Sequence, residues 1–167
     1  PSIISVFAGR IADSGIDPID TMLKCSEIIS KKKNVELLWA SSREILNIIR
    51  QAVEKSSPGE WVLAFGWDPV LVPDLYNPTL SELDSISNNT PIFILTQMMH
   101  HAFVNSAVYK TAGITKNTPN PKGGGVFQKD SVGNLNGVIY EFSALQYVLD
   151  KMPKTPQGTA ELLLNLQ

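Results

Sequence analysis

Short apolar runs alternate with segments of helical periodicity along most of the chain. Four of the runs are rich in β-branched and aromatic residues and are bounded by Gly, Pro, Ser or Asn, a pattern typical of buried strands. These predicted strands cover residues 3–9, 35–40, 61–67 and 91–97. Because a helical pattern follows each run, the chain is predicted to be α/β with a parallel sheet, as in part of a (β/α) barrel or in a doubly wound sheet.

The predicted helices have clear start and stop signals. Asp17 and Pro18 fit the cap and first turn of one helix, and Ser41 or Ser42 caps the next. A short helix is predicted over 79–87, and a fourth over 102–113, which Gly113 ends. A complete barrel needs about 250 residues, so four such units predict a partial TIM barrel only.

The C-terminal part has a different pattern. Residues 122–141 form two short strand patterns around a Gly/Asn turn, which predicts a β-hairpin inserted near 122–141. Helices are predicted over 143–152, stopped by Pro153, and over 159–166. The three glycines at 123–125 lack the GK[ST] of a phosphate-binding loop and are expected to form a flexible turn.

Composition narrows the possible functions. The net charge of −2 gives no excess of positive charge for binding nucleic acid. No apolar run is long enough to span a membrane. The single cysteine, Cys25, excludes an internal disulfide and fits a reducing compartment, so a cytoplasmic protein acting on a small molecule is expected. Cys25 lies in the middle of a predicted helix without a nearby His, which argues against a nucleophile.

Two motifs in the N-terminal third are long enough to suggest a family. Residues 3–51 carry them: FAGRIADSGIDP (7–18) and VELLWASSREILNI (35–48) resemble consecutive late strands of transaldolases, which are Schiff-base aldolases built on a (β/α) barrel. By this resemblance Arg10 would hold a sugar phosphate, with Ser5 as a weaker candidate for the same role. The alternative for Arg10 is a surface ion pair at a strand end. No lysine occupies the matching Schiff-base strand, so aldol transfer by this chain alone is not expected.

A second resemblance covers residues 44–167 and points to a different family. GEWVLAFGWDP (59–69), HAFVNSAVYKTAGI (101–114), PNPKGGGVFQKD (119–130) and GNLNGVIYE (133–141) resemble, in the same order, the YtcJ-like amidohydrolases (amidohydrolase family 3). The two resemblances together predict a chimera-like chain, with a transaldolase-like segment over 1–47 and an amidohydrolase-like segment over 48–167. The two segments could also form one compact domain.

The amidohydrolase resemblance implies a set of site residues. His101 and Glu141 are the catalytic candidates, and Trp67 and Asn105 are candidates for substrate binding. Each has a structural alternative. His101 could donate to the backbone, and Glu141 could be an exposed carboxylate at the end of the hairpin. Trp67 could be a core residue and Asn105 a helix cap.

The family's metal ligands are not recognisable in this chain. It has no HxH motif, and its only histidines, His100 and His101, are adjacent. The side chains of adjacent residues on a strand point to opposite faces, so they do not easily coordinate one metal ion. No metal-binding residue is therefore assigned, and a divalent metal such as zinc is expected only if missing ligands are supplied.

The resemblances imply three functions. The first is metal-dependent hydrolysis of C–N bonds, with an active-site set that is incomplete on this chain. The second is transfer of a three-carbon ketol unit between sugar phosphates. The third is a non-catalytic barrel fragment, which would form a homo-oligomer to bury its open sheet edges.

Overall fold

A computed structural model describes residues 3–5, 41–67, 69 and 75–152, with residues 3–5 described as backbone only. The remaining residues are outside the description. They include the predicted strand 35–40, the predicted helices 17–33 and 159–166, Arg10 and Cys25. Most of the segment that resembles transaldolases is therefore outside the described residues.

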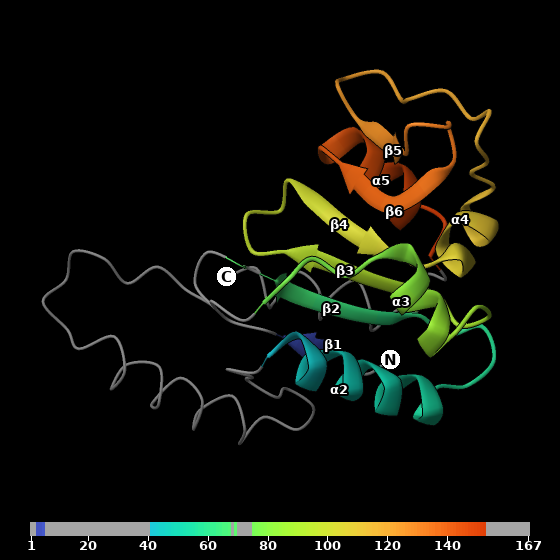
Figure 1. The fold of residues 1–167 in the computed structure, drawn as a ribbon. Helices are drawn as coiled ribbons and strands as arrows, with labels where there is room; N and C mark the ends of the chain where they lie inside the picture. Colours follow the sequence, from blue (N-terminus) through green and yellow to red (C-terminus); the bar gives the residue numbers. More distant parts are fainter. Residues whose placement is uncertain (1–2, 6–40, 68, 70–74, 153–167) are drawn as a thin grey trace, which may run out of the picture.

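The described strands form one six-stranded sheet, in the order β1-β2-β3-β4-β6-β5 (Figure 1). The strands are β1 (Ile3–Ser5), β2 (Val62–Trp67), β3 (Ile92–Thr96), β4 (His101–Val104), β5 (Val126–Lys129) and β6 (Leu135–Tyr140). Strands β1, β2 and β3 are parallel, as predicted. Strand β4 is antiparallel to β3 and to β6, and β5 is antiparallel to β6, so the sheet is mixed.

The predicted helix over 102–113 is wrong in its first third. His101–Val104 is strand β4, and helix α4 spans Ser106–Ala112. The run Ala102-Phe103-Val104 pairs with β3 on one side and is flanked by β6 on the other, and its side chains alternate between the two faces of the sheet. Three consecutive buried residues suit a strand between two others better than a helix surface.

Helices contribute to both faces of this sheet. The helices are α2 (Ser42–Lys55), α3 (Leu80–Ile86), α4 (Ser106–Ala112) and α5 (Phe142–Leu149). Alternate residues of β3 belong to separate hydrophobic clusters: Ile92 and Ile94 pack with α2 and α3, whereas Phe93 packs with α4 and α5. A barrel would fill its inner face with strand side chains alone. The α/β class is thus confirmed, but a partial barrel is not.

Several boundaries follow the sequence signals. Ser41 caps α2 through a capping box with Glu44, which confirms one of the two predicted caps. Thr79 and Glu82 form a second capping box at the start of α3. Gly113 ends α4 in the left-handed conformation, as predicted.

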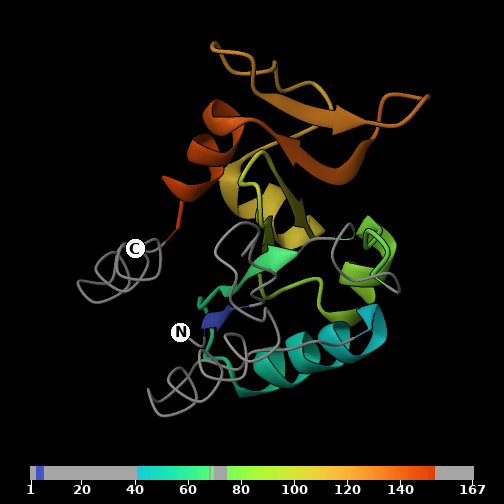
Figure 2. The same cartoon turned by 90° about the vertical axis from the view of Figure 1, so that its left-hand side faces the viewer.

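The predicted hairpin is present and extends the sheet. Strands β5 and β6 lie at one end of the molecule with α5, while β1 and α2 lie at the opposite end (Figure 2). Among the described helices, none is long and apolar enough to cross a membrane.

Candidate functional site

The predicted catalytic residues, His101 and Glu141, lie at the same end of the sheet. Thr96 ends β3 and His101 begins β4, while Glu141 directly follows β6. Because β4 is antiparallel to both neighbours, β3 and β6 run in the same direction and end at this same edge. The carboxyl ends of parallel strands are where α/β sheets place ligands.

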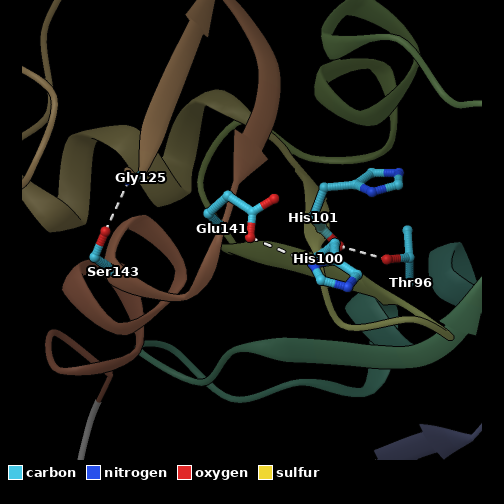
Figure 3. A network of polar contacts seen from close by, with 6 residues as sticks. All are labelled: Thr96, His100, His101, Gly125, Glu141 and Ser143. Carbon is cyan, nitrogen blue, oxygen red and sulfur yellow. Dashed lines mark hydrogen bonds and ion pairs between the residues drawn. The ribbon is translucent and has the colours of Figure 1, made fainter. Parts of the chain in front are cut away.

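His100, which sequence reasoning set aside, is the direct partner of Glu141 (Figure 3). Its Nδ1 lies 3.3 Å from Oε2 of Glu141, and the backbone N–H of Glu141 donates to the carbonyl of His100 at 2.7 Å. The two side chains are 64% and 51% exposed. A pair this exposed adds little to stability, so both groups remain available to another molecule.

His101 has a more enclosed environment. Its ring packs edge-on against Phe103 and tilted against Tyr140, with ring centroids 5.3 Å apart in both cases. Partial burial lowers the pKa of His101 below its ordinary value, His100 lowers it further, and the opposing effect of Glu141 is smaller. The lowered pKa favours the neutral imidazole, in which one ring nitrogen donates and the other accepts a hydrogen bond.

Glu141 has a strained backbone. Its φ of 63° and ψ of 155° lie in a region that is almost restricted to glycine. The strain is maintained by the hydrogen bond to His100 and by the carbonyl of Glu141, which accepts from the N–H groups of Ala144 and Leu145. Such strain tends to accumulate at binding and catalytic residues.

Substituting glycine for Glu141 tests this strain. The variant E141G is expected to be more stable by about 1 kcal/mol, because relief of the strained conformation exceeds the entropic cost of glycine. Urea unfolding measures the change. The control E141Q keeps the strained backbone and should stay within about 0.5 kcal/mol of the parent protein. A loss of stability in E141G would show that the backbone at residue 141 is not strained.

Asn105 lies away from this site, in a position that favours the helix-cap alternative over substrate binding. The side chain is fully buried. Its Oδ1 accepts from the N–H groups of Ile92 and Val108, and its Nδ2 donates to the carbonyls of Ser87 and Thr90. All of its hydrogen-bonding capacity is used within the chain, so the helix-cap alternative holds.

Trp67 is also a core residue rather than a substrate contact. It is 1% exposed, and its ring packs edge-on against Phe103 with centroids 6.2 Å apart. Ser5 is on β1 and its side chain is not described, while Arg10 is outside the described residues. Their proposed contact with a sugar phosphate remains a prediction.

Sequence reasoning missed the groups that surround His101. Thr96 is buried, and its Oγ1 donates to the carbonyl of His101 at 2.8 Å. Tyr140 pairs with His101 across β4 and β6. The strand signal in 135–140 was recognised, but the residue opposite His101 depends on the register between β4 and β6, which the sequence does not specify.

A metal centre does not fit the described residues. They contain no group of three His, Cys, Asp or Glu side chains placed to share one ion. The side chain of His100 is directed to Glu141, whereas the ring of His101 points away from Glu141 (Figure 3). A structural or catalytic zinc ion takes at least three protein ligands, and the described edge offers no such set.

A shallow groove of about 480 Å³ lies elsewhere, between α2 and α3, and none of the predicted site residues lines it. Its walls combine charged and apolar side chains: Arg43, Glu44, Leu46, Asn47, Arg50, Tyr76, Glu82, Ser85 and Ile86. Glu44 and Glu82 are both occupied in capping boxes.

Comparison with known proteins identifies the family to which the chain belongs. Residues 32–166 match the family model described as Amidohydrolase family, which is most of the 167-residue chain. The chain belongs to the amidohydrolase family. This match confirms the amidohydrolase resemblance, and it also includes residues 32–51, part of the segment that resembles transaldolases. The transaldolase-like origin of the residues before 32, and hence the chimera, remain predictions.

Individual relatives agree with this assignment. The chain is 32% identical over 105 residues to the N-substituted formamide deformylase of Arthrobacter pascens, covering 63% of this chain and 19% of that protein. It is 28% identical over 130 residues to the putative amidohydrolase YtcJ of Bacillus subtilis, covering 76% of this chain and 24% of that protein. The chain therefore spans about a fifth to a quarter of the length of these relatives.

A solved structure shows a partial similarity. An uncharacterized metal-dependent hydrolase from Pyrococcus horikoshii OT3 matches 66% of this chain and 18% of its own length, at 21% identity and a TM-score of 0.46.

Proposed function

We propose that this amidohydrolase-family chain contributes the substrate-side wall of a metal-dependent hydrolase of C–N bonds. The observation that supports the proposal most directly is the family match over residues 32–166, combined with the position of His101 and Glu141 at the same end of the sheet, where β3 and β6 finish. The Arthrobacter relative is a deformylase of N-substituted formamides, so amides of this class are the substrates to test first.

The described residues would bind and orient the substrate rather than hold the metal. The neutral imidazole of His101 can donate to an amide carbonyl or accept from an amide N–H. The carboxylate of Glu141, exposed beside His100, can accept a proton from the attacking water and donate it to the amine nitrogen as the C–N bond breaks. A divalent metal, held by ligands outside the described residues, would lower the pKa of the water that attacks the carbonyl. Zinc is the ion we propose.

A segment exchange tests the role of this chain. Residues 59–141 would replace the aligned segment of the Arthrobacter deformylase, and formate release from N-substituted formamides would be measured. The hybrid is expected to retain turnover, and H101A and E141A within it should each lower kcat at least about tenfold, the lower range for loss of a positioned acid or base. The matched control N89A changes an exposed residue and should leave kcat unchanged.

The unmodified 167-residue chain provides the complementary measurement. Metal analysis should find less than one ion per chain, and the chain alone should release no formate. A folded, metal-loaded hybrid without turnover would contradict the proposal. Borohydride trapping of a sugar-phosphate adduct on the 167-residue chain would favour the transaldolase alternative instead.

A further inference from the structure

We propose that Tyr140 and Thr96 are positioning residues for His101, with Tyr140 fixing the imidazole ring and Thr96 fixing the backbone from which the ring projects. The inference rests on the proposed function, because it concerns the side chain that would meet the substrate. It extends that function to two residues that do not themselves contact the reacting atoms.

Thr96 completes the pairing of β3 and β4 where the backbone ladder stops. The last pair in the register of these strands is Leu95 with Ala102. One position further on, the hydroxyl of Thr96 donates to the carbonyl of His101 at 2.8 Å. The turn between the strands contains Met99 at a φ of 55°, so the chain on this side of His101 is itself unusual. The Thr96 hydroxyl therefore fixes the carbonyl of His101 on the β3 side, beyond the last regular pair, while Tyr140 of β6 pairs with His101 on the other side.

Tyr140 and Phe103 fix the ring from two directions. Tyr140 is the residue opposite His101 on β6, and its ring is inclined by 34° to the imidazole. Phe103 is two residues along β4 on the same face, and its ring is nearly perpendicular to the imidazole, at 89°. Contacts with two aromatic rings restrict rotation about the side-chain bonds of His101 before any substrate arrives, which reduces the entropic cost of orienting it.

The charges around His101 do not by themselves account for its lowered pKa. The titratable groups nearby are His100, the residue directly before β4, and Glu141 directly after β6, and the ring of Tyr140 packs against the imidazole. Glu141 favours the protonated imidazole, yet burial outweighs it and lowers the pKa of His101. Since Tyr140 contributes to this burial, removing its ring should admit water to the imidazole and return its pKa toward the ordinary value.

Histidine NMR on the 167-residue protein tests the inference without any activity measurement. The chain has two histidines, so one additional variant, H100Q, assigns both signals. In Y140L the titration midpoint of His101 should move upward, and its Cε1–H should lose the part of the ring-current shift that comes from Tyr140, while the part from Phe103 remains. The control Y140F retains the ring and should leave both unchanged. T96V, which keeps the shape of threonine, should change the His101 signals, and T96S should restore them.

Two results would overturn the inference. One is a His101 midpoint and ring-current shift in Y140L equal to those of the parent protein, which would mean that Tyr140 only supports the sheet. The other is a set of unchanged His101 signals in folded T96V. Unfolding of Y140L is detected by loss of dispersed amide signals, and Y140V and Y140M then serve as further truncations at the same position.

The hybrid deformylase separates this inference from the proposed function. If both hold, Y140L should lower kcat about fivefold or more and shift the pH profile of kcat, whereas Y140F should change neither. If the NMR result holds but the hybrid is inactive, the positioning of His101 stands and the proposed hydrolase function fails. If the hybrid is active and Y140L changes neither the NMR signals nor kcat, the positioning role alone is wrong.

Discussion

Alanine at position 105 is expected to destabilise the fold by about 4 kcal/mol, measured as the free energy of unfolding in urea. Asn105 connects three parts of the chain: the start of β3, the loop after α3, and the first turn of α4. Its removal leaves the N–H of Ile92 and the carbonyls of Ser87 and Thr90 without this partner, while the N–H of Val108 keeps its bond to the backbone carbonyl of residue 105. Each buried polar group left unpaired costs about 1–3 kcal/mol, and the costs are not fully additive.

The matched control for Asn105 is the exposed Asn89 in the loop after α3. The side chain of Asn89 is solvent-accessible, and its backbone N–H donates to Ser87 whether or not the side chain is present. N89A should therefore change stability by less than about 0.5 kcal/mol. Equal losses in N89A and N105A would show that the hydrogen bonds of Asn105 do not hold these elements together.

The second large effect is expected at Gly125, where alanine should cost about 3 kcal/mol. A Cβ at this position would lie 2.5 Å from the backbone nitrogen of Ala144 and 2.5 Å from Oγ of Ser143. The backbone nitrogen belongs to α5 and cannot rotate away as a side chain can. Because the N–H of Gly125 also donates to Oγ of Ser143 at 2.9 Å (Figure 3), a shift that relieves the clash would lengthen this bond. Overpacking of this kind costs about 1–3 kcal/mol or more.

The adjacent Gly124 provides the control for Gly125. A Cβ there would meet nothing within 4 Å, but its φ of +88° is unfavourable for alanine. G124A should therefore cost only about 1 kcal/mol, from backbone strain alone. Chemical denaturation of both variants measures the difference. A G125A loss no larger than that of G124A would mean that the hairpin and α5 separate easily. The expected flexible turn over 123–125 is thus only partly correct, since Gly125 is a buried packing position.

Local signals predicted the elements well where neighbouring strands did not interfere. The apolar runs at 61–67 and 91–97, the cap at Ser41 and the stop at Gly113 are all found in the structure. The sequence pattern does not predict strand β4, because three apolar residues directly before a helix have the pattern of that helix's first turn. Only pairing with β3 and β6 decides that they extend as a strand, and that pairing is non-local.

The candidate site was predicted in part. The sequence motifs singled out His101 and Glu141, and the fold brings both to one edge. They also suggested Asn105 and Trp67, because amides and indoles are common both in binding sites and in structural positions. Burial separates the two uses, and burial depends on which residues pack around them.

The sequence by itself determined the α/β class, the positions of most helices and strands, the net charge of −2 and the amidohydrolase resemblance. Each of these depends on local periodicity, on composition or on the order of motifs. Only the tertiary structure decided that the sheet is mixed and that Glu141 is partnered by His100. It also decided that His101 is enclosed by Tyr140 and Phe103. These features depend on strand order and register, which are fixed when distant segments bury their apolar faces together.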